Sequence, residues 1–276
     1  MPPDSDTDAG IEKKPDEQNG EAAEPLAIIS DIHGNLDALE TVLADMESRG
    51  VKRIVCLGDV IGYGPNPCEC LDIIRTRCEW SLMGNHDFAC LYEPTSFNAS
   101  AEASAFWTRR QLELEPDDDL RRQRWQYLGN LQIRKQNNGS LWVHASPRRP
   151  INEYIFPDDV FTAPNKMNQI FERFEKRCFV GHTHVQGVFT DEPDFYPPQD
   201  LRGNYTIFAD EKFICNPGSV GQPRDRDPRA AYAILHEDKS QIEFVRLEYD
   251  IQAVIDKIKK QADLSDFLGQ RLLEGR

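Results

Sequence analysis

The chain has 276 residues, and its 32 lysines and arginines against 47 aspartates and glutamates give a formal net charge of -15. This balance argues against a general nucleic-acid or anionic-membrane surface, because both polyanions would be repelled. Hydrophobic residues make up 39% of the chain, which is enough for a packed core. Residues 1–24 are acidic and have no apolar run, so we expect a disordered tail there and one domain over residues 25–276.

The sequence contains no segment typical of secretion or of membrane insertion. There is no secretory signal, and no run approaches about 18 apolar residues. The seven cysteines have neither disulfide-framework nor zinc-finger spacing. We therefore expect a cytoplasmic protein with reduced thiols and with neither a membrane nor a nucleic acid as its partner. Nothing in the sequence predicts an oligomeric state.

The ordered part begins with an alternation of strands and helices. Apolar runs at 26–29 and 53–57, and a run ending at Met83, predict three strands. Apolar faces over 36–46 and 70–74 predict the helices between them. This β-α-β-α-β order favours a parallel sheet.

Residues 90–130 are expected to form a helical insert, and the chain beyond them is rich in strands. Further strands are predicted at 131–135, 141–144, 178–180, 185–190, 205–209, 213–215, 231–235 and 242–247. Further helices are predicted at 98–128 (interrupted near Pro116), 168–174 and 251–273 (two helices broken near Asp263). Residues 191–204 carry three prolines and are expected to be irregular.

Polar side chains gather where the predicted strands end. Seven of them have the chemistry of metal ligands: Asp31, His33, Asp59, Asn85, His144, His182 and His184. In a parallel sheet the strand ends converge on one edge, where ligands bind. Asp31 and His33 are two residues apart, as are His182 and His184, so on an extended chain each pair would point the same way.

The donor set itself limits the choice of metal. Two carboxylates, one amide and four imidazoles suit manganese, iron, zinc, cobalt or nickel better than calcium, which prefers oxygen alone. Seven donors are too many for one closed zinc site, and they are about right for a pair of ions. The sequence therefore predicts a dinuclear centre.

The ordered set of motifs resembles the calcineurin-like metallophosphoesterase superfamily, whose signature reads D-x-H, G-D, G-N-H-[DE], H and G-H-x-H. The matching blocks are Asp31-Ile32-His33, Gly58-Asp59, Gly84-Asn85-His86-Asp87, His144 and Gly181-His182-Thr183-His184, followed by Asn216-Pro217-Gly218-Ser219. The detailed likeness is to the small bacterial and archaeal phosphodiesterase-type branch. The resemblance implies a four-layer α/β-β/α sandwich of two mixed sheets, with the metal site at the strand ends.

The resemblance also implies a role for each residue. The ligands implied for two divalent ions are Asp31, His33 and His184 for the first, Asn85, His144 and His182 for the second, and Asp59 for both. Manganese is the expected metal, with iron, zinc, nickel or cobalt as alternatives. A water activated by both ions would be the nucleophile, and His86 would protonate the leaving group or stabilise the transition state.

The second block departs from the Ser/Thr protein phosphatases of the superfamily. Those enzymes read G-D-x-x-D-R-G where this chain has Gly58-Asp59-Val60-Ile61-Gly62-Tyr63-Gly64. Gly62 replaces the acid that orients the catalytic imidazole, and Tyr63 replaces the arginine that binds phosphate. This argues against a protein phosphatase of that type, and it leaves a backbone carbonyl as a possible partner for His86.

We expect a metal-dependent phosphoesterase that hydrolyses a small phosphodiester or phosphomonoester. Its candidate substrate-binding residues are Tyr63, Asn66, Arg148 and Arg224. The alternative is a hydrolase of dinucleoside polyphosphates of the diadenosine tetraphosphate type. A non-catalytic scaffold is the third interpretation, which the complete ligand set and His86 disfavour.

Overall fold

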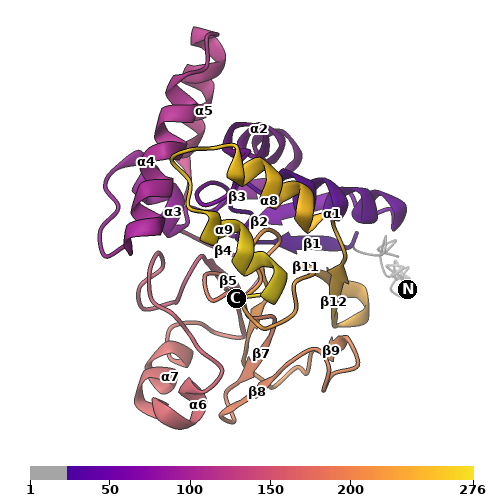
Figure 1. Ribbon diagram of the computed structural model, residues 1–276. Coiled ribbons are helices and arrows are strands. Elements are labelled where there is room, and N and C mark those ends of the chain that lie inside the picture. Colours follow the sequence, from indigo (N-terminus) through magenta and orange to yellow (C-terminus); the bar gives the residue numbers. More distant parts are fainter. Residues whose placement is uncertain (1–23) are drawn as a thin grey trace, which may run out of the picture.

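The computed structural model describes residues 24–276 of the chain (Figure 1). The acidic tail predicted at 1–24 lies outside the described residues, apart from Glu24. In the described part, no helix combines the length and the apolar character that crossing a bilayer requires.

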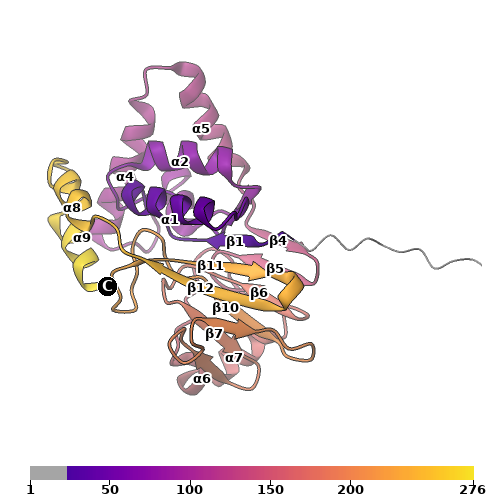
Figure 2. The same cartoon turned by 90° about the vertical axis from the view of Figure 1, so that its right-hand side faces the viewer.

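Two facing sheets are each covered by helices on the outer side. Helices α1 (Leu36–Ser48) and α2 (Pro67–Arg77) cover the first sheet. Helices α6 (Asp159–Thr162) and α7 (Pro164–Phe171) cover the second. Figure 2 shows these helices above and below the pair of sheets, which confirms the predicted four-layer α/β-β/α sandwich.

The first sheet contains the parallel half that the sequence predicts. Its six strands lie in the order β3 (Trp80–Ser81), β2 (Arg53–Cys56), β1 (Leu26–Ile29), β11 (Ala230–His236), β12 (Gln241–Leu247) and β9 (Asn204–Thr206). Strands β1, β2 and β3 pair in parallel, whereas β11 runs antiparallel to β1. The sheet is therefore mixed, as predicted.

The second sheet is also mixed and has a parallel centre. Its six strands lie in the order β4 (Arg134–Asn137), β5 (Ser140–Val143), β6 (Arg177–Phe179), β10 (Phe213–Asn216), β7 (Gly187–Thr190) and β8 (Asp194–Tyr196). Strands β5, β6 and β10 are parallel, so the loops after β5 and β6 leave the sheet on the same edge.

Strand β1 shows how the sandwich is filled from both sides. Ala27 and Ile29 belong to the core under the helices of the first sheet, whereas Leu26 and Ile28 belong to the core between the sheets. Successive side chains of a strand point to opposite faces, so a strand that is apolar throughout can serve two core layers. Both faces of β1 are thus anchored just before the loop that begins at Ser30.

Two strand predictions need correction. Strand β4 lies at Arg134–Asn137 rather than at 131–135, because Asn138 (φ 47°) and Gly139 (φ 72°) form a two-residue left-handed turn that joins it to β5. The segment 191–204 is not irregular throughout, because β8 pairs with β7 inside it. Prolines flank β8 and do not interrupt it.

The remaining helices include α3 (Asn85–Leu91), which starts inside the third polar block. The sequence pattern predicted neither α3 nor α6, nor the 3₁₀ helix that follows β11. The others are α4 (Ala99–Glu113), α5 (Asp118–Asn130), α8 (Ile251–Lys259), α9 (Asp266–Gln270) and the short 3₁₀ helices η1 (Glu237–Lys239) and η2 (Arg271–Glu274). The predicted interruption near Pro116 and the predicted break near Asp263 are confirmed.

A buried arginine joins α5 to α2. The side chain of Arg124 is 6% exposed, and its guanidinium donates to Asp72 at 2.6 Å and to Glu115 at 2.8 Å. In contrast, Arg122 on the same helix is 62% exposed and pairs with Asp119, which is 78% exposed. Helix α5 extends away from the sheets in Figure 1, so these contacts near its buried side hold it to the domain.

We predict that Arg124→Met lowers the free energy of unfolding by about 1–3 kcal/mol, because two part-buried carboxylates lose their charged donor. Arg122→Met is the matched control on the same helix and should cost less than about 1 kcal/mol. Urea unfolding followed by circular dichroism in the presence of a chelator measures both. Equal losses for the two variants would contradict the role assigned to Arg124.

The cost of Arg124→Met should also depend on pH. Burial raises the pKa of Asp72, but the hydrogen bonds and charges of Arg124 and Arg75 outweigh it and lower the pKa below its usual value. The stabilisation is therefore present above the unfolded pKa of about 3.9 and is lost as the pH falls through the lower folded value. Unfolding curves at pH 7 and pH 5 should show the same difference between wild type and variant, and the difference should shrink below about pH 4.

Candidate metal centre

The polar blocks meet in one place between the two sheets. Asp31 and His33 follow β1, Asp59 follows β2, His144 follows β5, His182 and His184 follow β6, and Asn85 and His86 open α3. Their donor atoms form two overlapping groups, one of Asp31, His33, Asp59 and His184 and the other of Asp59, His144 and His182. Within each group all donor atoms lie within 4.8 Å of one another. Asp59 belongs to both groups.

The backbone at the ligand positions is left-handed. Asp31 and His33 have φ values of 54° and 50°, and His182 and His184 have 65° and 59°. The expectation of an extended chain at these two pairs is therefore wrong. Left-handed φ is costly for residues other than glycine, and strain of this kind is typical of functional sites. The loop after β1 is held by backbone hydrogen bonds, including His33 N–H to the carbonyl of Asp59 at 2.9 Å.

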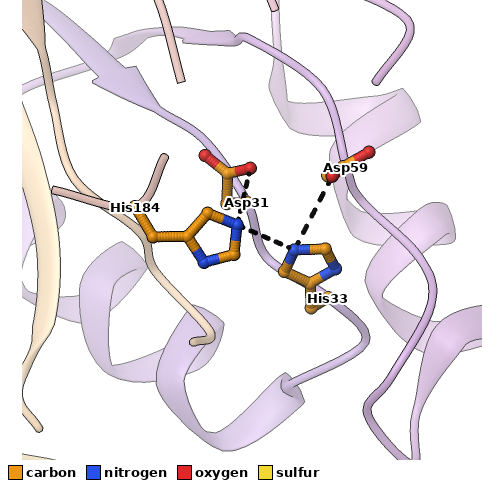
Figure 3. A group of neighbouring side chains, drawn as sticks. All are labelled: Asp31, His33, Asp59 and His184. Atoms are coloured by element: carbon orange, nitrogen blue, oxygen red, sulfur yellow. Dashed lines mark hydrogen bonds and ion pairs between the residues drawn. The ribbon is translucent and has the colours of Figure 1, made fainter. Parts of the chain in front are cut away.

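Figure 3 shows the first cluster, in which two imidazoles and two carboxylates point toward one another. The Nε2 atoms of His33 and His184 lie 3.2 Å apart. His184 Nε2 lies 3.2 Å from Asp31 Oδ1, and His33 Nε2 lies 3.7 Å from Asp59 Oδ2. All four side chains are at most 1% exposed.

The second cluster shares Asp59 and adds an amide. His144 Nε2 lies 3.4 Å from Asp59 Oδ2 and 3.3 Å from Asn85 Oδ1. The Nε2 atom of His182 is buried and has no hydrogen-bond partner among residues 24–276. A buried polar atom without a partner is costly, and a cation held by this nitrogen would remove the cost.

Backbone carbonyls fix the tautomer of three of the histidines. His33 Nδ1 lies 3.3 Å from the carbonyl of Ile61, and His144 Nδ1 lies 2.9 Å from the carbonyl of Leu57. His184 Nδ1 contacts the carbonyl of Gln222 in the same way. A carbonyl only accepts, so each Nδ1 carries a hydrogen, and each ring in its neutral form presents a lone pair on Nε2 to the cluster. This is the arrangement that a metal-ligating histidine needs.

The pKa values in the first cluster also favour the binding of a cation. Burial lowers the pKa of His33 well below its usual value, and burial together with Arg224 lowers that of His184. Burial raises the pKa of Asp31 and of Asp59, but the nearby histidines outweigh it and hold both below their usual range. Near neutral pH, two carboxylates and two neutral imidazoles therefore face one another, and a divalent cation fits this set of acceptors.

His144 differs because it lies beside the shared carboxylate. Burial lowers its pKa, but Asp59 outweighs this effect and raises the pKa to about 9. Burial and the charge of His144 lower the pKa of His182 to about 3. Metal binding at the second cluster would release the His144 proton, because a ligating imidazole is neutral.

Asp87 organises the loop that carries Asp59. Its carboxylate accepts the backbone N–H groups of Asp59 at 2.8 Å, Gly84 at 3.0 Å, Val60 at 3.0 Å and Ile61 at 3.3 Å. Burial and the neighbouring Asp59 raise the pKa of Asp87 to about 7. The spacing of the motifs indicated no role for Asp87, although it occupies the third position of α3, where an acid commonly caps a helix.

The ring of His86 is positioned by packing. It contacts Tyr63, Phe97 and His33, with ring centres 4.2, 4.6 and 4.8 Å away. Its Nδ1 is buried without a hydrogen-bond partner among the described residues, so the expected backbone carbonyl is not found. A Cβ at Gly62 would lie 2.6 Å from this nitrogen, so only glycine leaves room for the ring in this position.

The predicted substrate residues do not all face the site. Tyr63 lines a pocket of about 640 Å³ beside the second cluster, together with Asn85, His86, Phe97, Arg149, Tyr154 and His182. Arg148 is directed to Glu153 at 3.0 Å and to Gln169, and Asn66 donates to Glu69. Arg224 lies over the Tyr63 ring. The wall built by Phe97 and Tyr154 was not found from the sequence.

Comparisons with known proteins agree with this geometry. The model of the calcineurin-like phosphoesterase superfamily domain matches residues 25–240. The chain is 38% identical over 258 residues to an uncharacterized protein of Methanocaldococcus jannaschii, which covers 91% of this chain and 98% of that protein.

Two solved structures are similar to this chain over most of its length. A metallophosphoesterase from Sphaerobacter thermophilus is 37% identical and has a TM-score of 0.78, covering 92% of this chain and 99% of that one. A hypothetical protein from Pyrococcus horikoshii is 19% identical with a TM-score of 0.69, over 91% and 98% of the two chains, and it shows the fold alone.

We predict that the wild-type protein binds two manganese ions per chain and that Asp59→Asn weakens binding at least about 100-fold, since the loss of even a supporting residue costs about 10–100-fold. The amide keeps the shape of the side chain but removes the charge shared by both clusters. Titration calorimetry and elemental analysis measure this effect. Asp263→Asn, which alters an exposed carboxylate, is the control. Full manganese binding by Asp59→Asn would contradict the assignment.

Proposed function

Because the chain belongs to the calcineurin-like phosphoesterase superfamily, we propose that it hydrolyses a small phosphodiester or phosphomonoester at two divalent ions. The family and the buried donors together indicate a metal-dependent hydrolase of phosphoric esters. The observation that carries the proposal is the pair of donor groups that share the carboxylate of Asp59.

The proposed ligands follow the two clusters. They are Asp31, His33 and His184 for one ion, Asn85, His144 and His182 for the other, and Asp59 for both. Manganese is proposed as the metal, with iron, zinc, nickel or cobalt as alternatives that the same donors accept. Divalent ions at such a site supply Lewis acidity toward phosphoryl oxygens and lower the pKa of water.

His86 is proposed as the residue that acts on the leaving group. It lines the pocket, in contact with Tyr63 and Phe97. Burial lowers its pKa to about 4, although Asp59 opposes this effect, so the ring is neutral near pH 7. A neutral imidazole donates one N–H, which would stabilise the charge that develops on the leaving oxygen.

The pocket supports a small substrate rather than a macromolecule. Its volume of about 640 Å³ lies within the range of small-molecule sites. Phe97 and Tyr154 supply an apolar wall, and Arg149 supplies a positive charge at its edge. We therefore propose a small phosphorylated substrate whose leaving group is bound against aromatic side chains.

One observation favours the alternative, a hydrolase of dinucleoside polyphosphates. Arg224 lies 5.9 Å from the centre of the Tyr63 ring, where it adds positive charge beside the proposed metal ligands. A polyphosphate chain would use this charge, whereas a simple monoester would not. The scaffold interpretation has no comparable support, because His86 and all seven donors are retained.

We predict that His86→Ala lowers kcat for bis(4-nitrophenyl) phosphate by about 10²–10⁴-fold while both manganese ions stay bound, because His86 acts on the leaving group and holds no metal. Steady-state kinetics and elemental analysis of the same samples measure this. His236→Ala is the control, because that histidine pairs with Glu243 away from the site, and its rate should stay within about twofold. A fully active His86→Ala protein would remove His86 from the reaction.

A further inference from the structure

Two arginines from distant parts of the chain lie over the same tyrosine ring. The guanidinium carbon of Arg224 lies 5.9 Å from the centre of the Tyr63 ring, and that of Arg271 lies 6.0 Å from it. Arg224 follows the Asn216-Pro217-Gly218-Ser219 motif, and Arg271 opens η2 near the end of the sequence. The ring itself is 8% exposed, so these side chains form part of its cover.

Neither guanidinium forms an ion pair with a side-chain carboxylate in the part of the chain from 24 to 276. The guanidinium of Arg224 donates to the Oε1 atom of Gln222, at 2.8 and 3.2 Å. Arg271 uses its Nε to contact the main-chain oxygen of Arg276, the last residue of the sequence, and its two terminal NH₂ groups form no hydrogen bond within residues 24–276. Most other arginines nearby are paired, as Arg229 is with Asp227 at 2.6 Å.

The two charges are half-buried and close enough to repel each other. Burial lowers the pKa of Arg271, and repulsion from Arg224 lowers it further, to about 10. Holding two like charges together with no side-chain carboxylate between them is unfavourable, and an anion bound between them would offset this repulsion. Guanidinium groups bind phosphoryl oxygens through paired N–H donors, which suits an anion of this kind.

This position borders the proposed metal ligands. The Tyr63 ring centre lies 4.8 Å from that of His33 and 4.2 Å from that of His86. The backbone N–H of Arg224 donates to the carbonyl of His184 at 3.2 Å. A substrate that places one phosphoryl group at the metal ligands could therefore extend a second one over Tyr63.

We propose that Arg224 and Arg271 bind a second phosphoryl group of the substrate, which is not the one cleaved. The preferred substrates then carry at least two phosphoryl groups, as nucleoside diphosphates and polyphosphate chains do. This inference rests on the proposed function for the scissile group, but the two can be tested separately.

Binding of AMP and ADP to the manganese-loaded protein tests the proposal, because the two nucleotides differ by one phosphoryl group. Wild type should bind ADP at least about tenfold more tightly than AMP, and Arg224→Gln and Arg271→Gln should each weaken ADP binding about tenfold, as expected for one charged hydrogen bond. AMP binding should change less than about twofold in both variants, and the lysine variants should recover part of the loss. Titration calorimetry at a fixed free manganese concentration measures all of these.

Arg226→Gln is the matched control, because it removes the same charge from an exposed side chain two residues from Arg224. Equal affinity of wild type for AMP and ADP would overturn the proposal, as would losses in Arg224→Gln and Arg271→Gln no greater than in the control. Circular dichroism confirms that each variant is folded. Hydrolysis of bis(4-nitrophenyl) phosphate is measured separately, so an inactive wild type with an intact ADP preference would reject the proposed reaction and leave the phosphoryl subsite standing.

Discussion

The buried carboxylate of Asp59 is the group on which the rest of the site depends. Its Oδ2 atom lies 3.7 Å from Nε2 of His33, which follows strand β1 of the first sheet. The same oxygen lies 3.4 Å from Nε2 of His144, which follows strand β5 of the second sheet. Its other oxygen accepts the backbone N–H of His86 at 2.7 Å. A single side chain thus ties together both sheets and the start of α3. Burial alone would disfavour this charge, so its surroundings must offset the cost with positive or hydrogen-bonding groups.

The backbone around Asp59 is arranged to hold the carboxylate in place. Asp87 accepts the N–H of Asp59, and a Cβ at Gly84 would come within 2.0 Å of the Asp59 carboxylate. Asp59 itself has a left-handed φ of 53°. Strain of this kind persists only where surrounding contacts over-determine the conformation. The core on both faces of β1 and the carbonyls that fix the histidine tautomers provide that constraint, and they hold the donors in convergent positions.

Sequence patterns predicted the parallel half of the first sheet and the candidate donors, because both follow from local rules, whereas the order of the four layers came from the resemblance to the superfamily. Strand ends converge in a parallel sheet, and metal ligands have a limited chemistry. The predicted position of β4 was wrong because the Asn138-Gly139 turn determines where this strand lies, whereas the prediction followed the apolar residues of the segment. The left-handed backbone at Asp31 and His33 depends on contacts with the loop after β2, which spacing does not reveal. The sequence also did not indicate Arg271, because this residue comes close to Tyr63 only when the chain folds and places η2 beside the ring.

The acidic composition and an anionic substrate are compatible because electrostatic effects at a site are local. At physiological ionic strength, exposed charges are screened beyond about 8 Å, so most of the net charge of -15 acts weakly at the centre. Near the site Arg224 and Arg271 are positive and have no side-chain carboxylate partner among residues 24–276, and two divalent ions would more than balance Asp31 and Asp59. An acidic surface is unfavourable for large polyanions. The net charge therefore does not argue against the small anionic substrate proposed above, because that substrate would meet the local positive charge of the site rather than the average surface.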